Sequence, residues 1–253
     1  MNQSVEIRII SLKNQEVRRN SMRNIFSLSN YSWGFFDAIS GENVDPYLIH
    51  YERGKRMKYP GHDMTRNEIA CFISHREVWK QCVKSKKDFL VLEDDAYIIR
   101  NGFDVSFLGK LIDAIRNSIG EGALVRLGHG AQQKNYKRMD CLINDFQLVR
   151  YRRDPLCALA YFISPAVAEK LLNASEKFYL PVDDFMWNYN ESHITVFDLE
   201  PVFFSAAVEG NPSTIGDRKK MKIKFLAKIK REFNRFLYVR KLRKIEWKIF
   251  KNK

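Results

Sequence analysis

The sequence predicts an α/β fold, in which helices flank a mixed, largely parallel sheet. Short apolar runs typical of strands alternate with segments of helical spacing, and this alternation is the pattern of α/β layers. Of the 253 residues, 45% are hydrophobic and 13% aromatic, which excludes a disordered chain. With 12 Gly and 4 Cys, the chain is neither collagen-like nor a disulfide framework. This length fits one large domain, or one domain with an appendage.

The first elements follow in chain order. The apolar run at residues 5–11 predicts a strand, and residues 14–28 have helical spacing. Residues 40–64 contain Gly and Pro among polar and aromatic groups, so we expect a long surface excursion of the kind that forms substrate loops or lids. A helix then begins at Thr65, whose spacing to Glu68 is that of a capping box, and extends toward Lys84.

The remaining elements continue the alternation. Further strands are predicted at residues 89–93, 124–127, 148–151, 158–163 and 195–198. Helical spacing returns at 104–119 and 165–177. Strands separated by helices pair in parallel, which gives the Rossmann-like arrangement.

Positive charge is concentrated at the C-terminal end. Residues 217–253 contain 16 Lys and Arg against 3 Asp and Glu, whereas residues 1–216 contain 27 of each sign. The change follows the turn-like segment 211–216. We therefore expect a compact domain over residues 1–216 and an appendage over residues 217–253.

The appendage has the pattern of a basic amphipathic helix, or of two. Apolar residues recur every four positions from Met221 to Leu237, and a similar stripe continues to Ile249. Such a helix suits the surface of an anionic membrane, where each Lys or Arg adds ~1 kcal/mol. The alternatives are a last helix that packs on its own domain and, with less support, a nucleic-acid-binding segment.

Three consecutive carboxylates, Glu93, Asp94 and Asp95, follow the apolar strand at 89–93. Ligands of open α/β sheets bind beyond the carboxyl ends of strands. Crowded carboxylates are tolerated where a divalent cation such as Mg²⁺ or Mn²⁺ neutralises them. If strand geometry persists, Glu93 and Asp95 face one side and Asp94 the other. A solvated acidic turn or a helix cap is the alternative.

A second acidic pair, Asp183 and Asp184, follows Pro181. Proline at a helix start and acids in the first turn are ordinary capping features. The functional alternative makes one carboxylate a general base over an acceptor hydroxyl, with Phe185 and Trp187 as a wall on which a sugar stacks. The spacing does not decide between these two interpretations.

The capped helix carries a third group of polar residues. At 100° per residue, Glu68 and His75 share a stripe with Phe72, Trp79 and Cys82. A polar group on that stripe needs a partner. A satisfied core histidine is the ordinary explanation. The alternative is a Ser74–His75 pair that faces a site, in which Glu68, Ser74 and His75 bind substrate. The cysteines lack zinc-finger spacing to each other and to histidine, so we expect no metal cage.

Together these motifs resemble glycosyltransferase family 25, the bacterial lipopolysaccharide and lipooligosaccharide sugar transferases related to collagen galactosyltransferases. The resemblance is carried, in order, by IISL at 9–12 with Arg18 and Arg19, EIACFISH at 68–75, LEDDA at 92–96, AYFIS at 160–164 and PVDD at 181–184. It covers nearly all of residues 5–216.

The resemblance implies a GT-A fold and inverting transfer of a hexose, galactose in preference to glucose, from a UDP-sugar. It assigns Asp95 to Mn²⁺ (or Mg²⁺), with Glu93 and Asp94 facing the nucleotide. Ser11 and Arg18 would lie near the nucleotide, and Ser213 near the diphosphate. Asp184, or its neighbour Asp183, would be the base. Further metal ligands would come from Asp198, Glu209 or water, since no histidine follows His193.

The resemblance also implies an oligosaccharide acceptor on a lipid of the bacterial inner membrane. The first 16 residues lack a secretory pattern, and the longest apolar stretch, residues 156–163, is far below the ~20 residues that cross a bilayer. We therefore expect a cytoplasmic enzyme held peripherally on the inner face of that membrane by its basic tail. Two alternatives stay open: a metal-dependent phosphohydrolase, and a non-catalytic adaptor for membrane or nucleic acid.

Overall fold

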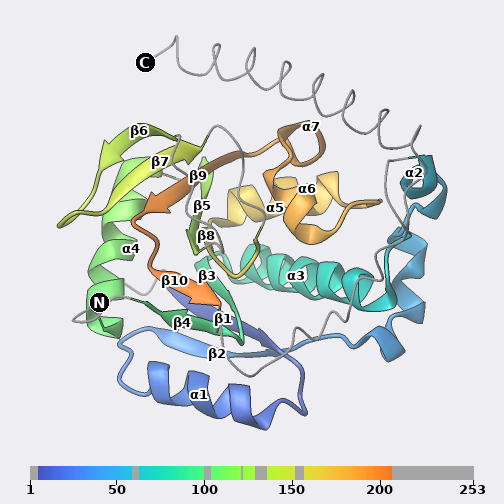
Figure 1. Cartoon of the computed structure of the whole chain (residues 1–253), viewed down its shortest axis with the longest axis horizontal. Coiled ribbons are helices and arrows are strands. Elements are labelled where there is room, and N and C mark those ends of the chain that lie inside the picture. The colour runs from blue at the N-terminus through green and yellow to red at the C-terminus, as the bar shows by residue number, and fades with distance from the viewer. Residues whose placement is uncertain are drawn as a thin grey trace, which may run out of the picture.

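The computed structural model describes residues 5–58, 63–99, 104–120, 122–128, 136–151 and 157–206. Its centre is a ten-stranded sheet with the main order β2-β1-β3-β8-β5-β9-β7-β6 (Figure 1). The strands are β1 (Val5–Ser11), β2 (Ser32–Asp37), β3 (Asp88–Glu93), β4 (Ala96–Ile98), β5 (Ala123–Gly128), β6 (Tyr136–Cys141), β7 (Gln147–Tyr151), β8 (Ala160–Ile163), β9 (Thr195–Glu200) and β10 (Phe204–Ala206).

The sheet is mixed and mostly parallel, as predicted. β1 pairs in parallel with β2 and β3, and β5 pairs in parallel with β9. β8 is antiparallel to both β3 and β5, and β7 is antiparallel to both β6 and β9. Strands β8 and β7 therefore run against the other six of the main order. The parallel pair β1–β2 needs a crossover, which α1 (Glu16–Phe26) supplies.

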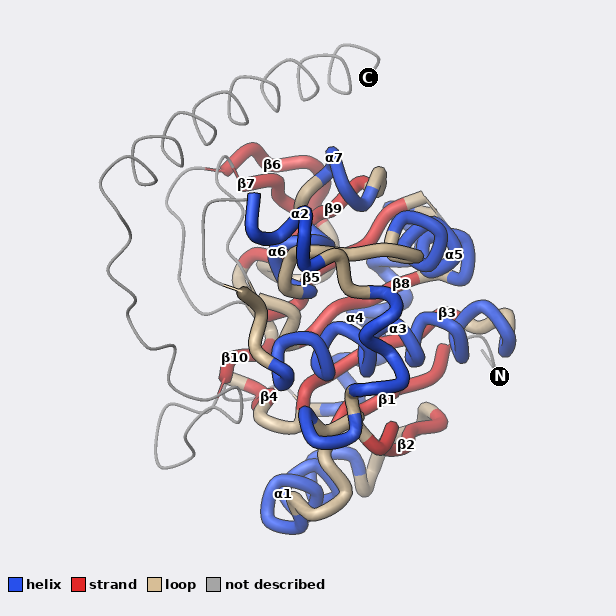
Figure 2. Tube along the Cα trace, turned by 90° about the vertical axis from the view of Figure 1, so that its right-hand side faces the viewer, coloured by secondary structure: helices blue, strands red, loops and turns tan. Residues whose placement is uncertain are grey.

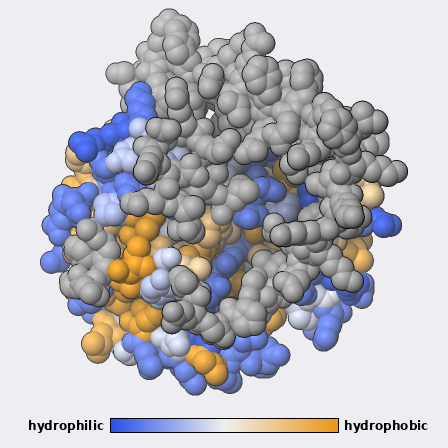
Figure 3. Space-filling view, in the orientation of Figure 1, coloured by the Kyte–Doolittle hydropathy of each residue, from blue (hydrophilic) through white to orange (hydrophobic). Residues whose placement is uncertain are grey.

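Helices cover both faces of the sheet. On one face lie α3 (Arg66–Ser85), α5 (Pro165–Ala174) and α6 (Val182–Trp187), and on the other lie α1 and α4 (Val105–Ile119). Strand β3 shows the division, because Phe89 and Val91 join the first core and Leu90 and Leu92 the second. Figure 2 shows α1 at the lower end of the molecule, beyond β2. Polar side chains dominate the coloured surface in Figure 3.

Helix α3 begins with the predicted capping box. The Thr65 hydroxyl accepts from the Glu68 backbone N–H at 3.1 Å, and a Glu68 carboxylate oxygen accepts from the Thr65 backbone N–H at 2.8 Å. The helix ends at Lys86, which adopts a left-handed conformation with φ of 57°. The predicted stripe is buried, with Glu68 3% exposed and His75 fully buried. Helix α3 therefore turns two polar side chains into the protein.

Four strands, β2, β4, β6 and β10, were not predicted from the sequence. β2 and β6 are the outer strands of the main order, and their side chains are largely half-buried or exposed. β6 lacks the apolar run by which we identified the other strands, and in β2 the aromatic residues Trp33, Phe35 and Phe36 are interrupted by Gly34. β4 and β10 are three-residue strands that pair with each other.

The excursion predicted over residues 40–64 is more regular than expected. It contains the 3₁₀ helices η1 (Gly41–Asn43) and η2 (Asp45–His50) and the short helix α2 (Arg53–Lys58). Val44 is fully buried in the hydrophobic core that also contains the apolar residues of α3. A hydrophobic anchor thus ties this segment to the domain.

The predicted appendage at residues 217–253, and Glu209 and Ser213 before it, lie outside the described residues. The short helix α7 (Tyr189–Ser192) completes the described elements. Among the helices of the described part, none is both long and apolar enough to span a membrane.

Candidate active site

A cavity of about 170 Å³ opens at the carboxyl ends of β1 and β3. Because these strands are parallel neighbours, the residues that follow them meet at one edge of the sheet. Helix α3 and the segment after β2 form the other walls. The predicted residues that line the cavity are Ser11, Arg18, Ser74, His75, Glu93, Asp94 and Asp95.

Asp94 is held by hydrogen bonds from two chain segments. One of its carboxylate oxygens accepts from the Ser11 hydroxyl at 2.7 Å, and the other accepts from the Arg18 guanidinium at 2.9 Å. The Arg18 residue is only 8% exposed, although it lies on helix α1. Arg19, beside it, donates to the Ser11 carbonyl at 2.9 Å and to Asp37 at 2.5 Å. Asp94 therefore locks α1 to the ends of β1 and β3.

Asp95 is in a different situation. Its Oδ2 lies 3.8 Å from the Arg18 guanidinium, and its Oδ1 is buried with no hydrogen-bond partner among the described residues. Burial, and secondarily the charge of Glu93, raises the pKa of Asp95 to about 6. A divalent cation would supply the missing partner for this oxygen and neutralise the adjacent carboxylates. The residues present therefore fit the predicted metal site.

The alternation of Glu93, Asp94 and Asp95 between two sides was expected only if strand geometry persisted through the triplet, and it does not persist. Strand β3 ends at Glu93, and Asp94 and Asp95 form a turn. All three side chains consequently border the same cavity. The alternation does not extend through the three carboxylates, because the strand ends at the first of them, Glu93.

Glu93 is the end of a buried chain of hydrogen bonds. The Trp79 indole N–H donates to the Tyr161 hydroxyl at 2.9 Å, and the distance from Tyr161 Oη to His75 Nδ1 is 2.8 Å. The distance from His75 Nε2 to a Glu93 carboxylate oxygen is 3.3 Å. If Tyr161 donates its proton to Nδ1, the neutral imidazole carries its own proton on Nε2 and donates it to Glu93. His75 is therefore both a satisfied core histidine and a residue that faces the site.

Ser74 and Glu68 have local bonding roles. The Ser74 hydroxyl donates to the Ala70 carbonyl at 2.8 Å and accepts from the Ile39 backbone N–H at 2.9 Å. It thereby attaches the segment after β2 to α3. Glu68 closes the capping box and lies outside the cavity lining. Each therefore has a bonding role in the fold, and their contact with substrate stays a prediction.

Asp183 and Asp184 lie in the first turn of α6 and are half-buried. An Asp183 carboxylate oxygen accepts from the Asp184 backbone N–H at 3.0 Å. The charge of Asp183 contributes, after burial and Glu93, to the raised pKa of the Cys71 thiol. Neither aspartate is among the residues that line the cavity, although the charge of Asp183 acts on Cys71, which does line it.

Asp198 does not lie at the cavity, which overturns its candidacy as a metal ligand. It is 1% exposed on β9 and pairs with the Arg126 guanidinium of β5. Arg126 in turn lies over the Trp187 ring, 4.1 Å from its centroid. The carboxylate is thus used within the sheet.

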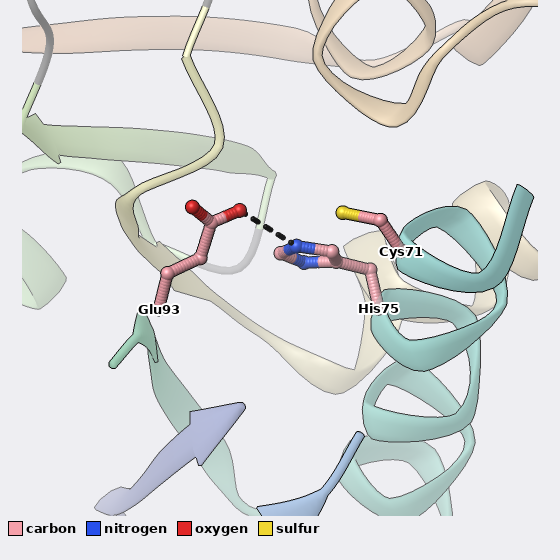
Figure 4. A group of neighbouring side chains, drawn as sticks. All are labelled: Cys71, His75 and Glu93. Atoms are coloured by element: carbon pink, nitrogen blue, oxygen red, sulfur yellow. Dashed lines mark hydrogen bonds and ion pairs between the residues drawn. The ribbon is translucent and has the colours of Figure 1, made fainter. Parts of the chain in front are cut away.

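Several residues around the site were not predicted from the sequence. Cys71 lies one turn before His75 on α3, and its sulfur, a His75 ring nitrogen and a Glu93 carboxylate oxygen lie within 4.8 Å of one another (Figure 4). The i, i+4 spacing of Cys71 and His75 places both side chains on one face of a helix. It differs from zinc-finger spacing, so it did not lead to the prediction of a metal site. Tyr161, the shared partner of Trp79 and His75, comes from a distant strand and had no local signal.

Comparison with known proteins gives a consistent result. Residues 5–186 match glycosyltransferase family 25 (LPS biosynthesis protein). Procollagen galactosyltransferase 2 of Homo sapiens is 27% identical over 236 residues, 84% of this chain and 37% of that protein. A glycosyltransferase 25 family member of Aedes aegypti is 31% identical over 207 residues, 76% of this chain and 32% of that protein.

The chain thus spans about a third of the length of these curated relatives. A solved glycosyltransferase involved in the glycosylation of the major capsid of PBCV-1 has a TM-score of 0.49 and 10% identity, over 82% of this chain and 95% of that one. The family match covers most of the chain and includes every residue that lines the cavity. The protein therefore belongs to glycosyltransferase family 25.

Proposed function

We propose that this protein transfers a hexose, galactose in preference to glucose, from a UDP-sugar to a lipooligosaccharide or lipopolysaccharide acceptor, with inversion at the anomeric carbon. The observation that carries the proposal is the buried Asp95 oxygen at the carboxyl end of β3, which has no hydrogen-bond partner within the described part of the chain and lies beside Arg18 and two further carboxylates. In a family 25 glycosyltransferase, this is a suitable place for the diphosphate of a nucleotide sugar.

The donor would lie in the cavity between β1, β3 and α3. Asp95 would hold Mn²⁺ or Mg²⁺, with the charge of Glu93 nearby, and that cation would stabilise the negative charge on the departing UDP. Arg18 is fixed by Asp94 at 2.9 Å and keeps its positive charge at the cavity edge. Ser11, through its bond to Asp94, keeps the turn after β3 in place for the nucleotide.

The base would come from α6. Asp184 or Asp183 would remove the proton from the acceptor hydroxyl as its oxygen attacks the anomeric carbon opposite the leaving UDP. A single displacement of this kind inverts the configuration. Asp183 has the support of its electrostatic coupling to the cavity wall, and Asp184 is its neighbour in the same turn. Ser213 would contact the diphosphate from the segment that follows.

The basic tail at residues 217–253 would hold the enzyme on the cytoplasmic face of the inner membrane. Its 16 Lys and Arg and its four-residue apolar spacing suit an anionic lipid surface. Attachment there would raise the effective concentration of a lipid-linked acceptor around the catalytic domain.

The test is a transfer assay with the full chain, a panel of UDP-hexoses, Mn²⁺ and a lipooligosaccharide acceptor. We expect acceptor-dependent UDP release and a β-linked product from an α-linked donor. Asp95→Asn should lower turnover at least about 100-fold, because several kcal/mol of charge stabilisation would be lost. The matched control is Asp88→Asn, at the opposite end of β3, which should keep turnover within about 2-fold.

Other outcomes would overturn the proposal. Phosphate release without an acceptor would indicate a phosphohydrolase. Absence of turnover and of thermal stabilisation with every UDP-hexose would indicate an adaptor, since a ligand stabilises a protein only where it binds the folded state. A product of retained configuration would refute the single displacement.

A further inference from the structure

We propose that Cys71, His75 and Glu93 form a binding site for a soft divalent cation of the Zn²⁺ type, in the wall of the cavity and separate from the oxygen-only site at Asp95. The residue types are those that zinc selects: a thiol, an imidazole and a carboxylate. Cation binding here can be measured without any substrate. The test of this site therefore does not depend on the sugar-transfer function proposed above.

The backbone already directs the three side chains to one point. Cys71 and His75 are four residues apart on α3, so they project from the same face of the helix. Glu93 approaches from the end of β3, and the three candidate ligand atoms lie within 4.8 Å of one another (Figure 4). A rigid helix and the end of a central strand therefore supply the ligands, with no mobile loop involved.

The distances are close to those of a zinc centre. In tetrahedral geometry, Zn–N and Zn–O bonds of about 2.0–2.2 Å place the nitrogen and oxygen about 3.4 Å apart. The distance from His75 Nε2 to the Glu93 oxygen is 3.3 Å. The cation could therefore replace the proton between these two atoms with little movement. The Cys71 sulfur would approach them by up to about 1 Å.

A supporting hydrogen bond is also in place. When a metal occupies Nε2 of a histidine, the proton must be on Nδ1, and its partner orients the ring. His75 Nδ1 lies 2.8 Å from the Tyr161 hydroxyl, which is itself held by the Trp79 indole at 2.9 Å. The Tyr161 oxygen has two lone pairs and can accept from both groups.

The surroundings favour a cation, and access is available. The carboxylates of Glu93, Asp183, Glu68 and Asp95 all act electrostatically on the Cys71 thiol. Cys71, His75 and Glu93 line the cavity, so a bound cation would keep its fourth position toward the cavity, for water or a ligand. On binding, the Cys71 thiol proton would go to solvent, and the His75 ring proton would move from Nε2 to Nδ1.

The test uses Co²⁺, a spectroscopic substitute for Zn²⁺, with the reduced full-length chain. We expect one equivalent of Co²⁺ to produce a thiolate-to-cobalt charge-transfer band and the intense visible bands of a tetrahedral ion, and Zn²⁺ to remove both. Cys71→Ser should abolish the charge-transfer band, and Glu93→Gln should weaken Zn²⁺ binding at least about 10-fold. Circular dichroism and thermal unfolding would show that both variants remain folded.

Two controls isolate the site. Cys141→Ser changes an exposed free cysteine on β6 and should keep the band. Asp95→Asn should also keep it, since that carboxylate belongs to the other site. The proposal is overturned if no thiolate band forms at one equivalent of Co²⁺, or if the band survives Cys71→Ser. If the cobalt band forms but the protein has no transferase activity, the proposed function is rejected and the cation site is supported. If the protein has transferase activity but no cobalt band forms, the cation site is rejected and the proposed function is supported.

Discussion

At the scale of single residues, the neighbouring aspartates Asp94 and Asp95 have different roles because their surroundings differ. Asp94 accepts hydrogen bonds from Ser11 and Arg18, so its charge is used within the fold. Asp95 has a buried oxygen without a partner among the described residues, and its pKa is raised to about 6 by burial and by Glu93. An aspartate side chain thus stabilises the folded state at position 94 and, when ionised, destabilises it at position 95.

This difference predicts opposite effects of the same substitution in metal-free protein. A carboxyl whose pKa is raised on folding binds its proton more tightly in the folded state, so its stabilising contribution is present below about pH 4 and is lost as the pH rises to about 6. Asp95→Asn should therefore raise the free energy of unfolding by up to about 2 kcal/mol at pH 7.5 and leave it nearly unchanged at pH 4. Urea unfolding with a chelator at both pH values measures this.

Asp94→Asn is the matched comparison. It should lower the free energy of unfolding by about 1–3 kcal/mol, because the buried Arg18 guanidinium would lose its anion. If Asp95→Asn destabilised the metal-free protein as much as Asp94→Asn, the contrast between the two aspartates would be refuted.

The hydrogen-bond chain behind Glu93 gives a second residue-scale prediction. Tyr161→Phe removes the hydroxyl that serves both Trp79 and His75, and it should lower the free energy of unfolding by about 1–3 kcal/mol. In the double variant Trp79→Phe, Tyr161→Phe the loss should be smaller than the sum of the two single losses, because no indole N–H is left unpaired. Additive losses, measured by urea unfolding, would contradict the shared bond.

At the scale of elements, the pair β5–β9 is joined by side chains as well as by its backbone. Arg126 and Asp198 are directly opposite in the register, and both are almost completely buried. Burial raises the pKa of Asp198, and the Arg126 guanidinium opposes that shift. The Arg126 guanidinium also stacks on Trp187, which belongs to α6, the helix of the predicted base. The ion pair thus connects the sheet to the acidic turn at the site.

Arg126→Met should therefore destabilise the protein by about 3–5 kcal/mol, since Asp198 would be left as an uncompensated buried charge. Adding Asp198→Leu should recover a large part of this loss, because burying two apolar groups avoids the desolvation of an ion. Chemical denaturation of the single and double variants makes the comparison. A double variant as unstable as Arg126→Met would refute the ion-pair explanation.

At the scale of the whole molecule, the layering explains where the site lies. Helices cover both faces of the sheet, as Figure 1 shows, so access to the strand residues is left at the carboxyl edge. The cavity occurs at that edge, where β1 and β3 end side by side. The family match and the cavity lie within residues 5–186, whereas the charge excess belongs to residues 217–253. Catalysis and membrane attachment should therefore be separable.

Deletion of residues 218–253 tests this separation. We expect the truncated protein to lose binding to anionic vesicles in a sedimentation assay and to turn over a soluble acceptor within about 2-fold of the full chain. Binding of the full chain should weaken as salt rises, because screening reduces the attraction of basic residues to the lipid surface. Neutral phosphatidylcholine vesicles serve as the control. Sedimentation of the truncated protein with anionic vesicles would show that the tail is not the anchor.

The sequence by itself determined the fold class, the six apolar strands, the capped helix α3 and the family. These properties depend on local patterns, namely apolar runs, helical spacing and a capping box, and each can be recognised from residues close together in the chain. The outer strands have weaker patterns, since β6 is largely polar and the aromatic residues of β2 are interrupted by Gly34, so neither strand was predicted.

Only the tertiary structure decided which side chains meet. The turn after Glu93 brought all three carboxylates to one cavity, and pairing of β3 with β8 placed Tyr161 against His75. It also withdrew Asp198 into an ion pair and brought Cys71 beside Glu93. Distances between side chains from different elements depend on strand order and register. Those are set by packing over the whole chain, and residue types in a local window do not specify them.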